Sequence, residues 1–502
     1  MLIDMVSCYP KGRTSLMRSF ALKLTLVFAT TFLIAMSAIN ARATYGAKIS
    51  VDEPQYLLTA LSIYEDFDLD ISDELDEQRY LPFHEIRLNQ QTIDLNEDGQ
   101  RISPHDPLLP LLLSIPMGLG GWLAAKITLA AIAAFTAMVT LWVAVRRFNV
   151  SENLAAGVVG IFFATPPMTS YATQIYPEMP AALAVVLSIG IISGPTTKNK
   201  IIGLAVTLTA LPWLSVKYVP VTIAIALLFL LRNWKAEKRK LAVFTGIMIV
   251  SAAAYLIVHK RIYGGWTVYA TGDHFVNGEF EVFGRSPNIP ARTRRLSGLL
   301  FDEQFGLIPW TPAFFALVPS VALLLRNRIK NSLNLVCCIC VGWGVATWVA
   351  LTMHGWWWPG RQLVVILPAA IIAMAILAEK SKIWKWFIFI GGLSGTTAWL
   401  WLAFEATTDR RTLVVDFHET SYPIYQVISA ISPNFTDFDQ RALLLNAAWL
   451  TALGLAIILT VLKKQIVHSS NPALRYRETS KVLMIEGTRK KLSVSKRVFE
   501  KS

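Results

Sequence analysis

The sequence predicts an all-α polytopic membrane protein with about twelve transmembrane segments, some of them short or broken. Of its 502 residues, 54% are hydrophobic and only 16% are charged, a composition unusual for a soluble domain. Apolar runs of nearly membrane-spanning length recur from end to end. These runs lie at residues 20–40, 121–145, 154–171, 179–194, 201–214, 219–231, 241–258, 306–325, 333–352, 363–377, 384–404 and 442–462. Membrane lipid is therefore an expected partner.

The charges of the loops predict how these segments are oriented. With the amino terminus in the cytoplasm, the inner loops hold about 30 basic and about 7 acidic residues, against about 16 and about 27 outside. We therefore expect a cytoplasmic amino terminus (1–19), a membrane domain (20–462) and a basic cytoplasmic tail (463–502). The outer loops would then be 41–106, 259–305 and 405–440. The net charge of +13 is read as an orientation signal, and no nucleic-acid partner is expected.

Two adjacent carboxylates, Asp52 and Glu53, follow the first apolar run. Pro54 is favourable in the first turn of a helix, and the apolar spacing to Tyr64 predicts a short amphipathic helix lying along the membrane. Ionised carboxylates are stabilised at a helix amino terminus. Asp52 and Glu53 can therefore serve as bases or bind a cation, and ordinary helix capping is the simpler alternative.

The first outer loop contains two partial calcium-loop patterns. One, formed by Asp66, Asp68, Asp70 and Glu77, has Ile71 where that loop needs glycine, so we set it aside.

The second pattern, Asp94-Leu95-Asn96-Glu97-Asp98-Gly99, has the glycine but not the closing glutamate. A hairpin turn between residues 91–94 and 100–103 explains it equally well. A divalent cation is therefore a candidate cofactor. Its candidate ligands are Glu53, Asp94, Asn96 and Asp98.

The loop returns to the membrane through a proline-rich segment that begins at Ser103 and contains His105. Three prolines in seven residues predict a half-inserted segment at the outer surface, followed by a bend near Gly121. His105 is interpreted either as a surface hydrogen-bonding residue or, with Asp52 nearby, as a catalytic candidate.

Two charged residues lie at the edges of apolar runs. Glu178 follows the short outer turn Tyr176-Pro177, and an acid so close to hydrocarbon is a candidate site residue, or else a residue that begins a helix. Lys217 can neutralise a phosphate or extend to lipid headgroups. Lys126 alone lies deep within a run and is expected to line the helix bundle.

Arginines on the outer side are candidates for binding an anionic ligand. Arg294 and Arg295 belong to a basic run before residue 298, and Arg361 stands at the start of an apolar run. A guanidinium binds phosphate with two parallel hydrogen bonds, although the basic run can equally be solvated. The tryptophans at 356–358 form either an interfacial belt or the wall of a sugar or prenyl slot.

Taken together, these residues resemble the C-type (GT-C) glycosyltransferases, a polytopic superfamily that includes protein O-mannosyltransferases and the aminoarabinose transferase of lipid A. In that superfamily an Asp or Asp-Glu in the first outer loop is catalytic or metal-associated, and Asp52-Glu53 matches it. The return segment at residues 105–110, the turn ending at Glu178 and the segment Pro359-Gly360-Arg361 are also similar. Gln55 and His105 depart from the pattern, because relatives often have a basic residue and a lysine there. The similarity extends to about Pro368.

The resemblance implies an enzyme that moves a sugar from a polyprenyl-phosphate donor to a glycan, lipid or protein acceptor at the outer face of the plasma (inner) membrane. Such chemistry needs a base for the acceptor hydroxyl and cations for the departing phosphate. Asp52 is the candidate base, with Glu53, Glu178 and His105 as further catalytic candidates. Arg361, Lys217, Arg294 and Arg295 are the candidates for binding donor phosphate. Direct displacement would invert the anomeric centre.

A multi-span transporter or lipid flippase for a cell-envelope precursor is the alternative function, because it would also have many spans and charges inside the membrane. Substrate contacts near the membrane midplane and two comparable halves would favour it. The polar residues of this chain instead concentrate at one face.

Overall fold

The computed structural model describes residues 14–469, apart from residues 90, 92, 95–98, 196, 236–237, 271–288 and 351–352. The chain divides into two units, Met1–Leu450 and Thr451–Ser502, and apart from the later residues of helix α17 (Gln440–Ser469) every residue discussed below belongs to the first.

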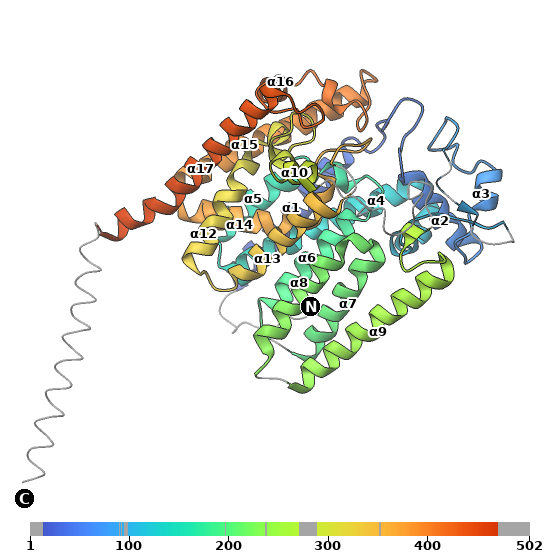
Figure 1. The fold of residues 1–502 in the computed structure, drawn as a ribbon, viewed down its shortest axis with the longest axis horizontal. Helices are drawn as coiled ribbons and strands as arrows, with labels where there is room; N and C mark the ends of the chain where they lie inside the picture. Colours follow the sequence, from blue (N-terminus) through green and yellow to red (C-terminus); the bar gives the residue numbers. More distant parts are fainter. Residues whose placement is uncertain are drawn as a thin grey trace, which may run out of the picture. The chain divides into compact units, whose positions relative to one another are not determined.

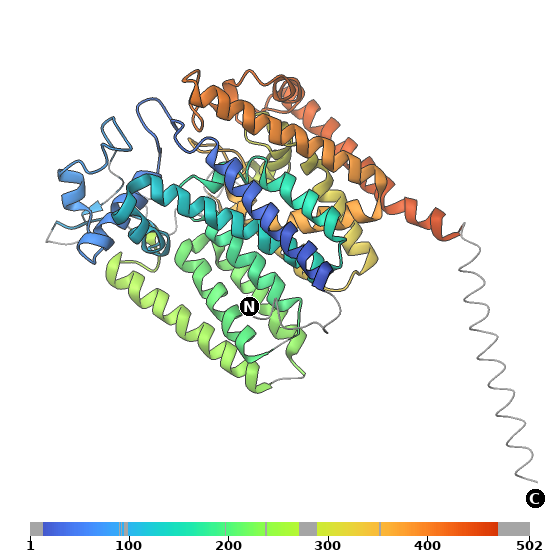
Figure 2. The same cartoon turned by 180° about the vertical axis from the view of Figure 1, so that it is seen from behind.

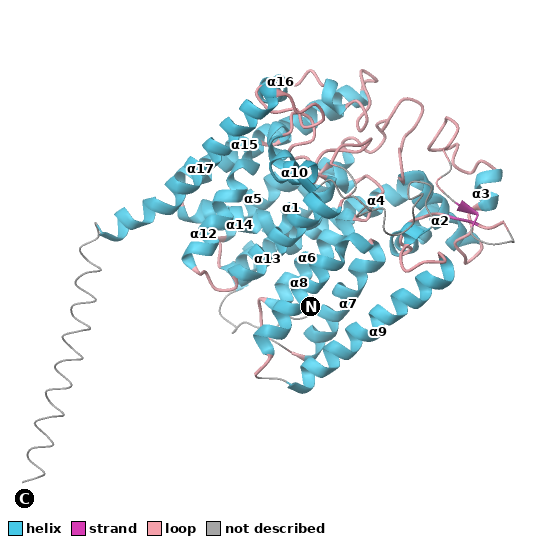
Figure 3. Cartoon of the chain, in the orientation of Figure 1, coloured by secondary structure: helices cyan, strands magenta, loops and turns pink. Residues whose placement is uncertain are grey.

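Helices make up almost all of the regular secondary structure in the described part of the chain, and loops join them (Figure 3). Eight of its helical segments are long and apolar enough to cross a membrane, and three shorter helical segments are also apolar. This confirms the predicted fold class. The principal helices are α1 (Thr14–Met36), α4 (Leu108–Phe148), α5 (Glu152–Phe163), α6 (Glu178–Ile192), α7 (Lys198–Leu214), α8 (Val219–Asn233), α9 (Lys238–Ile262), α12 (Leu317–Asn327), α13 (Ser332–Gly344), α14 (Leu367–Lys380), α15 (Lys382–Thr407) and α17 (Gln440–Ser469).

Shorter elements fill the connections between these helices. They are α2 (Glu53–Glu65), α3 (Ser72–Asp76), α10 (Ile289–Phe301), α11 (Leu307–Trp310), α16 (Pro423–Ala430), the strands β1 (Ile93–Asp94) and β2 (Arg101–Ile102), and the short turns η2 (Ser170–Ala172), η3 (Val216–Tyr218), η4 (Val268–Ala270), η7 (Pro312–Ala316), η8 (Val345–Val349), η9 (Arg361–Ile366) and η10 (Phe417–Glu419).

Each predicted apolar run overlaps one of the principal helices, but the run at 154–171 is too long. Helix α5 ends at Phe163, three residues before the Pro166-Pro167 pair. Proline lacks the backbone N–H and restricts the residue before it, so a helix ends there. The chain from 164 to 177 instead forms loops and the short turn η2, and leads into Glu178.

Helices α7, α8 and α9 lie side by side in both views of the ribbon (Figures 1 and 2). Helix α14 packs against α4, α5, α12, α13 and α15, and nearly all of its residues are buried. The turn η9, which begins at Arg361, leads directly into α14, so Arg361 is joined to a helix that is almost completely buried.

Helix α4 contains the predicted bend. At Gly121 the backbone has φ 63° and ψ −163°, a conformation that a residue with a Cβ rarely adopts. The bend divides α4 into a first part that carries the prolines and a second part that continues as a long apolar helix. The two segments predicted from the sequence are thus present, and hydrogen bonding joins them into one kinked helix.

The first outer loop folds into α2, α3 and the two strands. Ile93 pairs with Ile102 and Asp94 with Arg101 in antiparallel register, so the hairpin prediction is confirmed for its strands. Helix α2 begins where predicted, but every residue from Glu53 to Ser62 is buried. The amphipathic character expected of this helix is therefore wrong for these residues, because α2 packs against α4 and α3. Its position along the membrane stays a prediction.

Candidate active site

Asp52 precedes the first residue of α2 but does not cap the helix. Its side chain makes no capping hydrogen bond. Instead, Oδ2 accepts hydrogen bonds from Nη1 and Nη2 of Arg361, each at 3.2 Å, and Oδ1 accepts one from Gln91 Nε2 at 3.3 Å. The simpler interpretation of Asp52 as a helix cap is therefore not supported.

Arg361 joins segments that are more than three hundred residues apart in sequence. It donates through Nε to Glu178 Oε1 at 3.0 Å in addition to its bonds with Asp52. Its guanidinium carbon lies 3.8 Å from the ring centre of Tyr176, close enough for a cation–π contact. Gly360, with φ 79°, sets the turn that aims this arginine inward.

Lys217 completes a cluster of four charges, which we call the charged cluster: Asp52, Glu178, Lys217 and Arg361. Lys217 Nζ donates to Glu178 Oε1 at 2.8 Å and to Gln362 Oε1 at 3.3 Å. One oxygen of Glu178 thus accepts from both cations. The structure brings together two of the predicted catalytic residues and two of the predicted phosphate-binding residues.

Several buried polar atoms around the charged cluster have no hydrogen-bond partner among the described residues. They are Oε2 of Glu178 and the hydroxyls of Tyr176 and Tyr218. A buried polar atom without a partner costs free energy. These atoms therefore mark a place where a polar ligand or water can bind beside the two cations.

Charge from the surroundings keeps Asp52 ionised. Burial on its own raises the pKa of this carboxyl, but the charges of Arg361 and His105 and the hydrogen bond from Gln91 outweigh burial and hold the pKa below its ordinary value. Asp52 is therefore a carboxylate that can accept a proton. If the guanidinium of Arg361 moved away, the pKa of Asp52 would rise and Asp52 would become a stronger base.

The identified hydrogen bonds of Glu53 come from backbone N–H groups of two loops. Its Oε2 accepts a hydrogen bond from the backbone N–H of Ile175 at 2.8 Å, and Oε1 accepts one from Ser50 at 3.4 Å. Burial raises the pKa of Glu53 to about 6, while the charge of Lys126 acts in the opposite direction. Lys126 itself donates to Lys48 O at 3.1 Å. This geometry assigns Glu53 to positioning the segment before Glu178.

His105 lies next to the charged cluster, and the residue after it is an anchor. His105 Nδ1 is 2.7 Å from Ser103 Oγ, and its ring centre is 4.4 Å from that of Tyr56. Asp106 is buried and accepts hydrogen bonds from Val216 N at 3.0 Å and Tyr255 Oη at 2.9 Å. Asp106 thereby fixes the turn that carries Lys217.

Arg294 and Arg295 lie on α10, where their identified contacts are with other parts of the chain. The Arg294 guanidinium packs over the ring of Phe438, and Arg295 Nη1 donates to Ala350 O at 2.7 Å. Neither contact involves the charged cluster. The prediction that these arginines bind the donor phosphate at the same place as Arg361 gains no support from the geometry.

Most of the candidate cation ligands cannot be placed relative to Asp52, so the predicted cation site stays a prediction. Asn96 and Asp98 lie outside the described residues, as does the side chain of Asp94. Among the described residues, the three-ligand group of His, Cys, Asp or Glu that is close enough to hold a metal ion is elsewhere in the first outer loop. Asp52 already faces a guanidinium, so we derive no step through a metal.

The three tryptophans differ in their surroundings. Trp358 is fully buried and packs near Trp310 and Trp399, Trp357 has its ring centre 5.0 Å from the Arg361 guanidinium carbon, and Trp356 is 71% exposed. One residue therefore belongs to the core, one to the wall of the site and one to the surface.

Gln91, Tyr176 and Tyr218 also contribute to the site. Tyr176 belongs to the turn before Glu178 that was noted in the sequence, and Tyr218 follows Lys217 directly. The sequence did not identify Gln91 as a site residue, because no motif in its loop indicates a contact with Asp52.

The sequence matches no protein-family model and no curated protein. Its structure is similar to that of ArnT from Cupriavidus metallidurans bound to undecaprenyl phosphate, with a TM-score of 0.50 and 13% identity over 87% of this chain and 77% of that one. This chain has the GT-C fold. The same ArnT in the apo state (TM-score 0.44, 13% identity, 87% and 76% covered) and the oligosaccharyltransferase of Archaeoglobus fulgidus (TM-score 0.40, 12% identity, 81% and 55% covered) are also similar.

In this GT-C fold the charged cluster draws on four separate segments, which are the start of α2, the start of α6, η3 and the start of η9. Three of them begin apolar helical segments long or apolar enough to enter a membrane. The cluster thus lies where helices of the membrane domain meet the loops.

Proposed function

We propose that this protein is a membrane glycosyltransferase that moves a sugar from a polyprenyl-phosphate donor to an acceptor hydroxyl at the outer face of the membrane. The observation that carries the proposal is the charged cluster itself. It holds two cations and two carboxylates together, with unpartnered buried polar atoms beside them. ArnT, which has the same fold, was solved with undecaprenyl phosphate, and this supports the class of donor.

The donor phosphate would bind to Arg361 and Lys217. Both cations already share Oε1 of Glu178, so an incoming phosphate would bind their remaining N–H groups and compete with Asp52 for those of Arg361. A guanidinium and an ammonium can together stabilise the charge that develops on the leaving phosphate. The acceptor hydroxyl would lie between Asp52 and the anomeric carbon.

The reaction is a direct displacement. The acceptor oxygen forms a bond to the anomeric carbon, the bond from that carbon to the phosphate oxygen breaks, and polyprenyl phosphate leaves with the bonding electrons. Asp52 takes the hydroxyl proton. When the phosphate draws Arg361 away, the main force that lowers the pKa of Asp52 is weakened, and Asp52 becomes a better base at the moment when it is needed. One displacement inverts the anomeric centre.

The decisive experiment uses the full chain in nanodiscs with radiolabelled lipid-phosphate sugars extracted from membranes. We expect the wild type to release polyprenyl phosphate and the Asp52→Asn variant to bind donor with transfer reduced about 100- to 10,000-fold. Glu419→Gln, which changes an exposed outer carboxylate, is the matched control and should be unaffected. Near-normal transfer by a folded Asp52→Asn protein would refute the proposal.

The same material tests the transporter alternative. Proteoliposomes containing a fluorescent lipid phosphate report its movement between leaflets without any bond cleavage. Movement that requires Arg361 and is not accompanied by release of polyprenyl phosphate would establish a flippase instead.

The outward orientation of the site follows from the loop charges and can be measured directly. Glu85 belongs to the predicted first outer loop, and Lys382 is the first residue of α15, next to the turn that follows α14. We expect an impermeant maleimide to label Glu85→Cys in intact cells and Lys382→Cys only after permeabilisation. The reverse pattern would place the charged cluster on the cytoplasmic side.

A further inference from the structure

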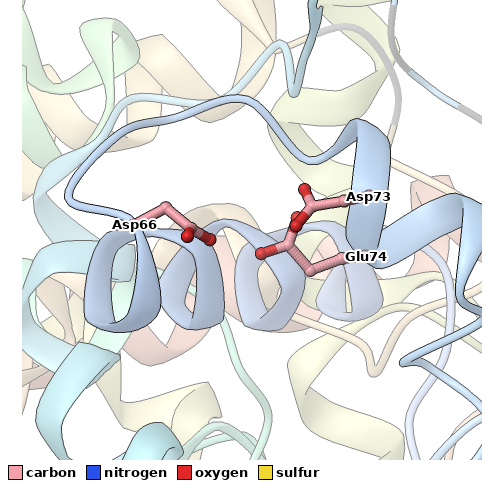
Figure 4. Close-up of side chains that lie close together, drawn as sticks. All are labelled: Asp66, Asp73 and Glu74. Carbon is pink, nitrogen blue, oxygen red and sulfur yellow. The ribbon is translucent and has the colours of Figure 1, made fainter.

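Three carboxylates meet at the outer end of α2, away from the charged cluster. Asp66 follows the last residue of α2, and Asp73 and Glu74 belong to α3. Their side chains point toward one another (Figure 4), and one oxygen from each lies within 4.8 Å of the others. Like charges at this separation repel, so an acidic group of this kind needs compensation.

Glu74 shows that the compensation does not come from the described residues. Its side chain is almost completely buried, and neither Oε1 nor Oε2 has a hydrogen-bond partner among them. Burying a carboxylate is costly unless it is paired, hydrogen-bonded or bound to a cation. Both oxygens of Glu74 nevertheless face the two aspartates in Figure 4.

The neighbouring acids of the loop have other partners. Asp68 Oδ1 accepts from Ser62 Oγ at 2.8 Å, and Asp70 Oδ1 accepts from Ser72 Oγ at 2.6 Å and Arg101 N at 2.9 Å. Asp68 and Asp70 thus stabilise the turn by hydrogen bonds. This agrees with setting the calcium-loop pattern aside because it lacks the required glycine. The group formed by Asp66, Asp73 and Glu74 shares only Asp66 with that pattern.

The identified ion pairs of the nearby arginines lead away from the three carboxylates. Arg79 makes two hydrogen bonds to Glu65, at 2.8 and 3.1 Å, and Arg101 donates to Asp76 at 2.7 Å. Pairing with these arginines therefore does not account for Glu74.

We propose that Asp66, Asp73 and Glu74 bind a divalent cation of the calcium class. Ca²⁺ binds oxygen ligands at about 2.3–2.6 Å, so ligands on opposite sides of the ion are about 4.6–5.2 Å apart. Oxygens no more than 4.8 Å apart can all reach one such ion. The remaining positions are open to water, because Asp66 and Asp73 are exposed.

The site would join the end of α2 to α3. Helix α2 carries Asp52 at its other end, and α2 also packs on α4. A bound cation would therefore fix the loop that holds Gln91 and Asp52 in place. This role is structural and does not depend on the proposed transferase activity.

A proton shared by two carboxyls is the competing explanation. Burial raises the pKa of Glu74 to about 8, and Asp73 acts in the same direction. A neutral Glu74 would need no cation. The two explanations differ in whether Ca²⁺ binds.

The test measures calcium binding and thermal unfolding of the purified full chain after removal of divalent ions by a chelator. We expect the wild type to bind about one Ca²⁺ and its melting temperature to rise with Ca²⁺ concentration. At a free concentration one hundred times the Kd, the ratio of unfolded to folded protein should fall about a hundredfold. Glu74→Gln should lose both the binding and the response.

Two further variants make the result unambiguous. Asp66→Asn changes an exposed ligand and should weaken Ca²⁺ binding at least tenfold even if Glu74→Gln does not fold. Glu77→Gln, an exposed carboxylate of the same segment that pairs with Arg79, should bind like the wild type. The proposal is overturned if the wild type shows no Ca²⁺ response, or if Asp66→Asn binds as tightly as Glu77→Gln.

Discussion

Removal of Arg361 should destabilise the protein strongly, and removal of its partner should rescue much of the loss. In Arg361→Ala, Asp52 loses two hydrogen bonds of 3.2 Å and Glu178 loses one of 3.0 Å. Glu178 keeps Lys217, whereas the remaining identified side-chain bond of Asp52 comes from a neutral amide. Breaking a buried ion pair on one side costs about 3–5 kcal/mol.

The double variant Arg361→Ala/Asp52→Asn replaces the stranded carboxylate with a neutral amide of the same shape. We therefore expect it to be more stable than the sum of the single changes predicts, with a coupling energy of about 2 kcal/mol. Unfolding free energies in mixed detergent micelles, measured for the wild type, both single variants and the double variant, give this value directly.

An exposed arginine–carboxylate pair provides the matched control. Arg79 and Glu65 also form two hydrogen bonds, but their side chains are 36% and 37% exposed. The cycle Arg79→Ala/Glu65→Gln should give a coupling energy of no more than about 1 kcal/mol. Equal coupling energies in the two cycles, or additive effects at Arg361 and Asp52, would refute the burial argument for the charged cluster.

Three further predictions concern the donor, the base and the packing. Arg361→Lys should raise the KM for donor less than Arg361→Ala, because it retains charge but not the planar fork; equal KM values would remove Arg361 from the phosphate site. Gln91→Leu deletes a bond that lowers the pKa of Asp52, so the acid limb of the kcat/KM profile should move to higher pH, and an unmoved limb would exclude Asp52 as the titrating base. Gly391→Ala places a Cβ 2.7 Å from a backbone nitrogen and should lower the free energy of unfolding by about 1–3 kcal/mol. In Gly160→Ala the Cβ meets nothing within 4 Å, so the free energy of unfolding should stay the same or rise slightly.

The sequence was sufficient for the helices because membrane insertion depends on local composition. Apolar length identified each principal helix, and Pro54 and Gly121 marked the start of α2 and the bend of α4. The predictions failed where contacts between distant segments, rather than the local sequence, decided the structure. Helix α2 contains polar residues, yet its first ten residues are all buried, because the first outer loop folds back over the helix.

The sequence also indicated which charges belong to the site, since charges next to hydrocarbon are costly without a function. It selected Asp52, Glu178, Lys217 and Arg361 separately. It could not show that Arg361 bonds to two of them, or that Arg294 and Arg295 make their contacts elsewhere.

Only the tertiary structure decided which charges meet, because the contacts of the charged cluster join residues as far apart as Asp52 and Arg361. No periodicity or spacing encodes such a contact, which depends on how helices α4, α6 and α14 pack. The same is true of Asp66 and Glu74. The calcium-loop pattern that contains Asp66 was set aside and did not include Glu74, whereas the fold leaves this buried glutamate, without a hydrogen-bond partner among the described residues, facing two aspartates.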